Sequence, residues 1–101
     1  MLIYNVTIQP SWDIHDAWKK WMVEVHLPEM METACFTKFH FCRLLDIDES
    51  DGPTYTVQYF AENRKQYNEY IRHFSPVLRQ KGLDLWGNKM IAFRSLMDVV
   101  H

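Results

Sequence analysis

An excess of positive charge is the first thing that this sequence lacks. Eleven Lys and Arg residues stand against thirteen Asp and Glu residues, which gives a formal net charge of −2 at neutral pH. A protein that binds the phosphate backbone usually carries a clear positive excess, because much of its affinity comes from counterion release. We therefore expect no nucleic-acid partner.

Cysteine and long hydrophobic runs are also scarce. The only two cysteines, Cys35 and Cys42, lie seven residues apart. In an extended strand this spacing corresponds to roughly 23 Å, whereas a disulfide needs Cα atoms within about 7 Å. We therefore expect two buried free thiols in a reducing compartment. The chain opens directly into a strand pattern and has no long apolar run, so we expect no signal peptide, no membrane span and a cytoplasmic location.

A convincing set of metal ligands is missing as well. His15 and His26 would lie on one helix stripe but about 16 Å apart, and His40 and Cys42 are only two ligands on one strand face. The acidic loop that begins at Asp46 lacks the glutamate that an EF-hand needs at its twelfth position. We therefore expect no metal and no cofactor.

What the sequence does have is a clear order of patterns along all 101 residues. Alternating apolar residues predict strands over residues 2–9, 36–47, 55–60 and 89–100, with a turn over 48–53. Helical spacing predicts one helix between the first two strands and another between the last two. The order strand–helix–strand–strand–helix–strand is typical of an α+β, ferredoxin-like βαββαβ fold. We expect a single domain over residues 1–101, with a four-stranded antiparallel sheet and helices on one face.

Prolines are expected to interrupt both helices. In the first helix, Ser11 or Asp13 is the expected cap, and Pro28 is expected to break the helix. The apolar residues of its stripe are Ile14, Trp18, Trp21, Met22 and Val25.

The second helix has the spacing of a capping box at Asn63 and Gln66. A break is expected at Ser75-Pro76, where the proline can start a further helix that runs to about Trp86, with Gly87 as the expected C-terminal cap. The apolar residues of its stripe are Tyr67, Tyr70, Ile71 and Phe74.

Both faces of the predicted sheet carry apolar residues, and the sequence leaves open which face meets the helices. A sheet this apolar on both sides should not face water. The economical solution is a homodimer that packs sheet against sheet. The alternative is a monomer whose own chain ends protect the second face.

A few polar residues among the many aromatic ones suggest a ligand site. The aromatic content is 15%. His26, at the end of an aromatic helix, is the candidate acid, base or ligand, although it also suits a helix C-terminus. Asn5 and Arg94 are candidate ligand-binding residues on strands, with Trp21 and Tyr59 as walls of a pocket. The alternative is that the strand residues hydrogen-bond to one another or to a partner chain.

Four segments resemble an uncharacterised bacterial family, known as a domain of unknown function (number 4286). The segments are Ile3-Tyr4-Asn5-Val6-Thr7, Trp18 to Glu29, Tyr55-Thr56-Val57-Gln58-Tyr59 and Ile91-Ala92-Phe93-Arg94-Ser95-Leu96. At the level of the fold, the chain is similar to the dimeric α+β barrel group, whose members include small monooxygenases, haem-degrading oxygenases and isomerases. This resemblance implies a homodimer with a pocket between each sheet and its helices.

The haem-degrading members use an Asn on the first strand with a Trp and a His on the second helix. Asn5 matches that Asn, but Tyr70 stands where the Trp is expected and His73 does not clearly match the His, and this departure argues against haem binding. We expect a protein that binds a small apolar or aromatic molecule, in the manner of a cofactor-independent monooxygenase or isomerase. The alternative is a non-catalytic dimeric interaction or regulatory module with a filled interior.

Overall fold

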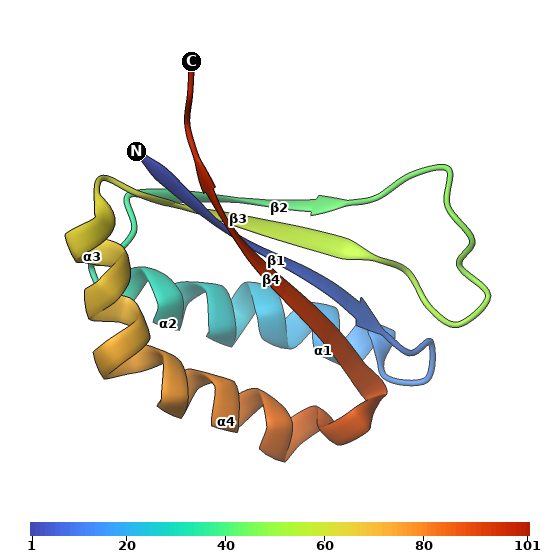
Figure 1. Cartoon of the computed structure of the whole chain (residues 1–101). Coiled ribbons are helices and arrows are strands. Elements are labelled where there is room, and N and C mark those ends of the chain that lie inside the picture. The colour runs from blue at the N-terminus through green and yellow to red at the C-terminus, as the bar shows by residue number, and fades with distance from the viewer.

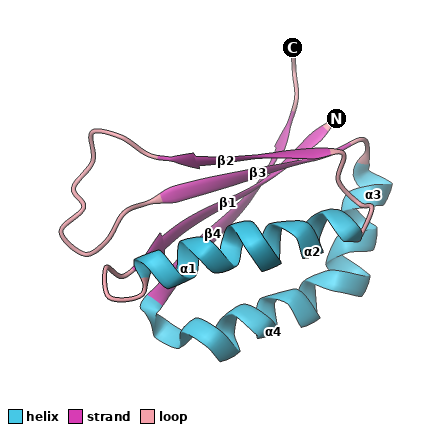
Figure 2. Ribbon diagram, turned by 180° about the vertical axis from the view of Figure 1, so that it is seen from behind, coloured by secondary structure: helices cyan, strands magenta, loops and turns pink.

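Four strands form one antiparallel sheet in the order β2-β3-β1-β4 in this computed structural model, which describes residues 1–101. The strands are β1 (Leu2–Pro10), β2 (Lys38–Arg43), β3 (Tyr55–Ala61) and β4 (Met90–Asp98). All helices lie on one face of the sheet, and the other face is uncovered (Figures 1 and 2). The α+β ferredoxin-like fold predicted from the sequence is confirmed. None of the helices combines the length and the apolar character that crossing a bilayer requires.

The first helical segment runs without a break from His15 to Glu32. It consists of α1 (His15–Trp21), a π-helical turn (Met22–His26) and α2 (Leu27–Glu32). In the π turn, the Leu27 N–H donates to the Met22 carbonyl, five residues back. Pro28 follows at the start of α2. The predicted break at Pro28 is therefore wrong, because the wider turn ahead of the proline accommodates a ring that would otherwise clash with a carbonyl of the preceding turn.

The second helical segment also contains a π-helical turn followed by a proline. It consists of α3 (Arg64–Glu69), a π-helical turn (Tyr70–Phe74) and α4 (Ser75–Trp86). The Ser75 N–H donates to the Tyr70 carbonyl, and Pro76 follows at the start of α4. The chain changes direction between α3 and α4 (Figure 1), so the predicted break at Ser75-Pro76, with a further helix that starts there and runs to Trp86, is confirmed. In both halves of the chain the proline lies two residues after the π turn.

Each π turn rotates the residues that follow it relative to the residues that precede it. In an uninterrupted α-helix, Val25 would lie on the same face as Trp18 and Met22. Instead Val25 is 41% exposed, and the buried residues that follow Met22 are Leu27 and Met30. The second segment has the same shift of five residues across its π turn, because the buried residues that follow Tyr70 are Ser75, Leu78 and Gly82.

The helix ends follow the predicted signals only in part. Asn63 caps α3, where its side-chain oxygen accepts a hydrogen bond from the Gln66 N–H at 3.0 Å. Gly87 ends α4 with a φ of +57°. The first helix begins at His15 after Ile14, which makes no side-chain cap, so the predicted caps Ser11 and Asp13 are wrong.

The face of the sheet toward the helices forms the core. In β1 and β3 every second residue is buried, and the buried partners face each other in register, as in Tyr4↔Tyr59 and Val6↔Val57. Phe36, just before β2, stacks on Tyr4 with ring centroids 6.2 Å apart. The predicted second strand, 36–47, was too long, because only Lys38–Arg43 pairs with β3.

The opposite face of the sheet is partly apolar and uncovered. On β4, Ile91 is 53% exposed, Phe93 is 70% exposed and Met97 is 38% exposed. Cys42 lies exposed in β2, so the expectation of two buried thiols is correct only for Cys35. The C-terminal end of the chain points away from this face rather than folding across it (Figure 1).

Candidate functional site

A cavity of about 50 Å³ lies between the sheet and the two helical segments. The sheet contributes side chains of β1, β3 and β4, which are Tyr4, Val6, Ile8, Tyr59, Ala92 and Arg94. The first helical segment contributes Trp21, Met22, His26 and Met30. The second contributes Tyr70, Leu78, Arg79 and Gly82, and Met90 closes the end at the start of β4. Eleven of these fifteen residues are hydrophobic, so the lining is an apolar wall with a few polar groups.

The cavity contains four of the five residues that the sequence suggested as ligand-binding. Trp21, His26, Tyr59 and Arg94 all line it. Asn5 does not, because it lies between Tyr4 and Val6 and side chains alternate across a strand. It lies on the uncovered face of the sheet, where its Nδ2 donates to the Thr7 hydroxyl at 3.2 Å.

The two π turns place residues in this cavity. Met22 and His26 are the first and last residues of the first π turn, and Tyr70 opens the second. Turns of this type occur often at functional sites, because they redirect side chains within a helix. The sequence contains a signal for these turns that apolar periodicity alone does not show: in each segment a proline lies within a long helical stretch.

His26 is held neutral in the wall of the cavity. Its ring stacks on the Trp21 indole with centroids 4.8 Å apart and planes 23° apart. The His26 pKa is lowered to about 4, mainly by burial and to a smaller extent by the positive charges of Arg94 and Lys81, while Glu29 opposes the shift. At neutral pH the imidazole therefore has one N–H donor and one free acceptor nitrogen. It can exchange a hydrogen bond or a proton with a guest, although it is a weak base.

Tyrosine hydroxyls supply the other polar groups of the interior. Burial raises the pKa of Tyr59 and of Tyr70 well above the usual value of a phenol. Tyr4 lies next to both, with ring centroids 6.0 Å from Tyr59 and 5.5 Å from Tyr70. The Arg79 guanidinium donates to the Tyr4 hydroxyl at 3.1 Å. Tyr59 and Tyr70 therefore remain protonated, so they can donate hydrogen bonds to a guest molecule.

Gly82 forms a gap in the helical wall. It is buried in the middle of α4, where glycine costs about 1 kcal/mol relative to alanine. A Cβ at this position would lie 3.7 Å from the Met90 methyl group and 3.8 Å from the Trp21 ring, which is ordinary contact. Packing therefore does not require a glycine here, and its effect is to leave space beside Trp21.

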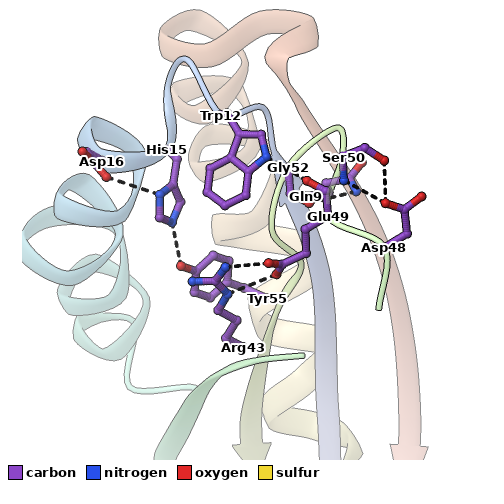
Figure 3. Close-up of polar contacts among 10 residues, drawn as sticks. All are labelled: Gln9, Trp12, His15, Asp16, Arg43, Asp48, Glu49, Ser50, Gly52 and Tyr55. Atoms are coloured by element: carbon purple, nitrogen blue, oxygen red, sulfur yellow. Dashed lines mark hydrogen bonds and ion pairs between the residues drawn. The ribbon is translucent and has the colours of Figure 1, made fainter. Parts of the chain in front are cut away.

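A second polar cluster lies outside the cavity, where the loop between β2 and β3 meets the start of α1 (Figure 3). The Trp12 indole N–H donates to the Glu49 carbonyl at 2.8 Å, and Arg43 forms a two-pronged ion pair with the Glu49 carboxylate. A ring nitrogen of His15 lies 2.6 Å from the Tyr55 hydroxyl. None of these residues lines the cavity. The cluster fastens the long loop to the rest of the domain.

The described side chains offer no metal centre and no haem triad. No group of three or more His, Cys, Asp or Glu side chains lies close enough together to hold one ion. The three positions compared with haem-degrading proteins are not brought together. Tyr70 lines the cavity, Asn5 lies on the uncovered face of the sheet, and His73 is exposed beside Glu69 at 3.4 Å.

Solved structures share this fold at low sequence identity. An ethyl tert-butyl ether (EthD) family protein from Bacillus halodurans is similar with a TM-score of 0.73 and 10% identity, over 99% of this chain and 100% of that one. A protein from Deinococcus radiodurans, named as a candidate antibiotic biosynthesis monooxygenase, has a TM-score of 0.72 and 10% identity, over 100% of this chain and 94% of that one. A dimeric ferredoxin-like protein from an uncultured marine organism has a TM-score of 0.69 and 16% identity, over 99% of this chain and 95% of that one.

These likenesses establish the fold alone, because identities are 16% or lower. No protein with a curated function matches the chain in sequence. The sequence profile of the domain of unknown function DUF4286 matches residues 1–100, and the chain therefore belongs to this family.

Proposed function

We propose that this protein binds a small apolar or aromatic molecule in the cavity between the sheet and the helices. The observation that carries the proposal is the composition of the cavity wall. Eleven of fifteen lining residues are hydrophobic, and the exceptions include one neutral histidine and two arginines. Small-molecule sites have this character, with an apolar wall that provides affinity and a few polar groups that fix orientation.

The volume of the cavity limits the size of the guest. Sites for drug-sized ligands usually measure about 300–1,000 Å³, and this cavity measures about 50 Å³. Three of its lining residues are methionines (Met22, Met30 and Met90), whose flexible side chains can move aside. The proposed guest is therefore no larger than one aromatic ring, and it enters when these methionines move aside. The presence of a cavity favours this role over that of an interaction module with a filled interior.

As the reaction class, we propose cofactor-independent chemistry of the monooxygenase or isomerase type on the bound molecule. His26 is the proposed catalytic residue, since its neutral imidazole lies in the wall and can accept or return a proton. The fold-level likeness to a protein named as a candidate antibiotic biosynthesis monooxygenase supports this class by analogy.

A thermal-shift screen with a library of small apolar and aromatic compounds tests the binding role. The matched variants are Ala92→Leu, which adds bulk inside the cavity, and Ala17→Leu, which adds the same bulk on the exposed side of α1. Compounds that stabilise the wild type are expected to stabilise Ala17→Leu equally and Ala92→Leu much less. A wild type that responds to no compound, or an Ala92→Leu variant that keeps the full response, would contradict the proposal.

We also propose that two copies of the chain pack through their uncovered sheet faces. Phe93 is 70% exposed at the centre of β4, and Ile91 is 53% exposed next to it, which is unfavourable in water. Several proteins of similar fold are described as dimeric. Light scattering is expected to give twice the chain mass of 12.2 kDa.

Two lysine substitutions test this interface. Phe93→Lys is expected to produce monomers, because it places a charge within the interface. Leu45→Lys, at a residue that is 76% exposed in the loop between β2 and β3, is expected to leave the dimer intact. A wild type that scatters as a monomer would refute the interface.

A further inference from the structure

Two arginines at the cavity have no acidic partner. Arg79 comes from α4 and Arg94 from β4, and both line the cavity while remaining exposed to solvent. No carboxylate lies within 4 Å of either guanidinium, whereas Arg43, Lys81 and Lys89 all form ion pairs elsewhere. No Asp or Glu lines the cavity. The cavity therefore combines an aromatic interior with two unneutralised positive charges where it opens to solvent.

The Arg79 guanidinium contacts a polar group of the cavity, and Arg94 lies close enough to others for its charge to act on them. Arg79 is oriented by its hydrogen bond to the Tyr4 hydroxyl, which itself lines the cavity. Arg94 lies opposite Val6 in the register of β1 and β4, on the face toward the helices. Its charge acts on several neighbours. The Arg94 charge adds to the lowering of the His26 pKa, of which burial is the main cause. It also opposes the rise that burial produces in the pKa of Tyr59 and Tyr70.

The geometry points to a ligand that combines an aromatic ring with an anionic oxygen group, with the ring in the cavity and the anion between Arg79 and Arg94. This inference rests on the proposed function, because it specifies the ligand of the same cavity. Guanidinium groups recognise carboxylates and phosphates through paired hydrogen bonds, so either anion suits the site. The neutral His26 stacked on Trp21 offers a flat surface for the ring and no competing charge.

Three probes of similar shape separate the contributions of charge and ring. Benzoate carries a carboxylate, phenyl phosphate carries a phosphate, and benzamide carries no charge. We expect at least one of the two anions to bind about tenfold more tightly than benzamide in NMR titrations of the ¹⁵N-labelled protein, since hydrogen bonds to charged groups are the stronger ones. The anion that binds more tightly identifies the preferred oxygen group.

Variants then test the two arginines. Arg79→Gln and Arg94→Gln are each expected to weaken the preferred anion several-fold and to leave benzamide nearly unchanged. Arg72→Gln is the matched control, because Arg72 is exposed, pairs with no carboxylate and does not line the cavity. Circular dichroism verifies that each variant is folded.

The possible failures are distinguishable. If benzamide binds and neither anion binds more tightly, the inferred charge recognition is wrong and the proposed cavity function stands. The same conclusion follows if Arg72→Gln weakens the anion as much as the two cavity variants do. If none of the three probes binds and the apolar library also has no effect, the proposed function itself is refuted, and the charge inference with it.

Discussion

Replacing Gly82 by alanine should make this protein more stable. Gly82 lies inside α4, and an added Cβ would meet its nearest neighbours at 3.7 and 3.8 Å, without a clash. Alanine favours the helix over glycine by about 0.5–1 kcal/mol, because glycine loses more backbone entropy on folding. For a domain of this size, we expect the melting temperature to rise by about 4 °C.

The other two glycines should respond in the opposite way to the same substitution. Gly52 has a φ of +155°, and a Cβ there would lie 2.0 Å from the Pro10 carbonyl oxygen. Since backbone atoms cannot move aside cheaply, Gly52→Ala should cost roughly 3 kcal/mol or more. Gly87 has open space around it but a φ of +57°, so Gly87→Ala should cost about 1–3 kcal/mol from backbone strain alone.

Urea unfolding followed by circular dichroism measures all three variants. The protein concentration must be equal throughout, because association would contribute to the apparent stability. The expected order of stability places Gly82→Ala first, then the wild type, then Gly87→Ala, with Gly52→Ala last. A Gly82→Ala variant less stable than the wild type by 1 kcal/mol or more would refute the reasoning, since it would mean that the space beside Trp21 cannot hold a methyl group. In the ligand screen, this variant should also bind more weakly, because the methyl group occupies part of the cavity.

Two further predictions concern buried polar side chains. Because the folded-state pKa of His26 is lowered to about 4 from an unfolded value near 6.5, the unfolded chain binds more protons between these values. The neutral His26 side chain therefore contributes at most about 3 kcal/mol to the free energy of unfolding. This contribution should be complete above pH 6.5 and lost as the pH falls to 4. His26→Gln should flatten this part of a stability–pH curve, whereas His73→Gln, at an exposed residue, should not; an unchanged slope in His26→Gln would contradict the assignment. Tyr55→Phe should lower the free energy of unfolding by about 1 kcal/mol, since it removes the hydrogen bond to His15. Tyr67→Phe is the control in urea unfolding, and equal losses of stability in the two variants would show that this hydrogen bond contributes nothing.

The predicted strands and helices were correct in order because each has its own local pattern. Alternation in β1 and β3 reflects a sheet with one buried face, and the structure confirms it residue by residue. The extent of β2 was overestimated, because the apolar alternation continues into a loop that finds no partner strand. A pattern of apolar residues predicts where a strand can form, but only pairing with a neighbour decides where it ends.

Pro28 shows where local reasoning fails in this protein. A proline in a helix usually breaks it, which is why a break is expected at Pro28. Packing of the first segment against the sheet instead keeps it continuous by widening one turn, whereas the second segment changes direction at Ser75-Pro76 as predicted. This wider turn moves Val25 out to solvent and brings His26 into the wall of the cavity. The spacing of the apolar residues alone could not reveal this shift, because it assumes a constant helical period.

By itself the sequence determined the fold class and the order of the elements, since local periodicity encodes both, and it suggested four of the fifteen residues that line the cavity. Only the tertiary structure decided which face of the sheet the helices cover. That choice depends on how the whole chain packs, because both faces carry apolar residues. It places Tyr4, Tyr59 and Arg94 at the cavity and leaves Asn5 and Phe93 on the uncovered face. Arg79 and Gly82 line the cavity for the same reason. They lie far from β1 in the sequence, and only the packing of α4 on the sheet brings them to the cavity.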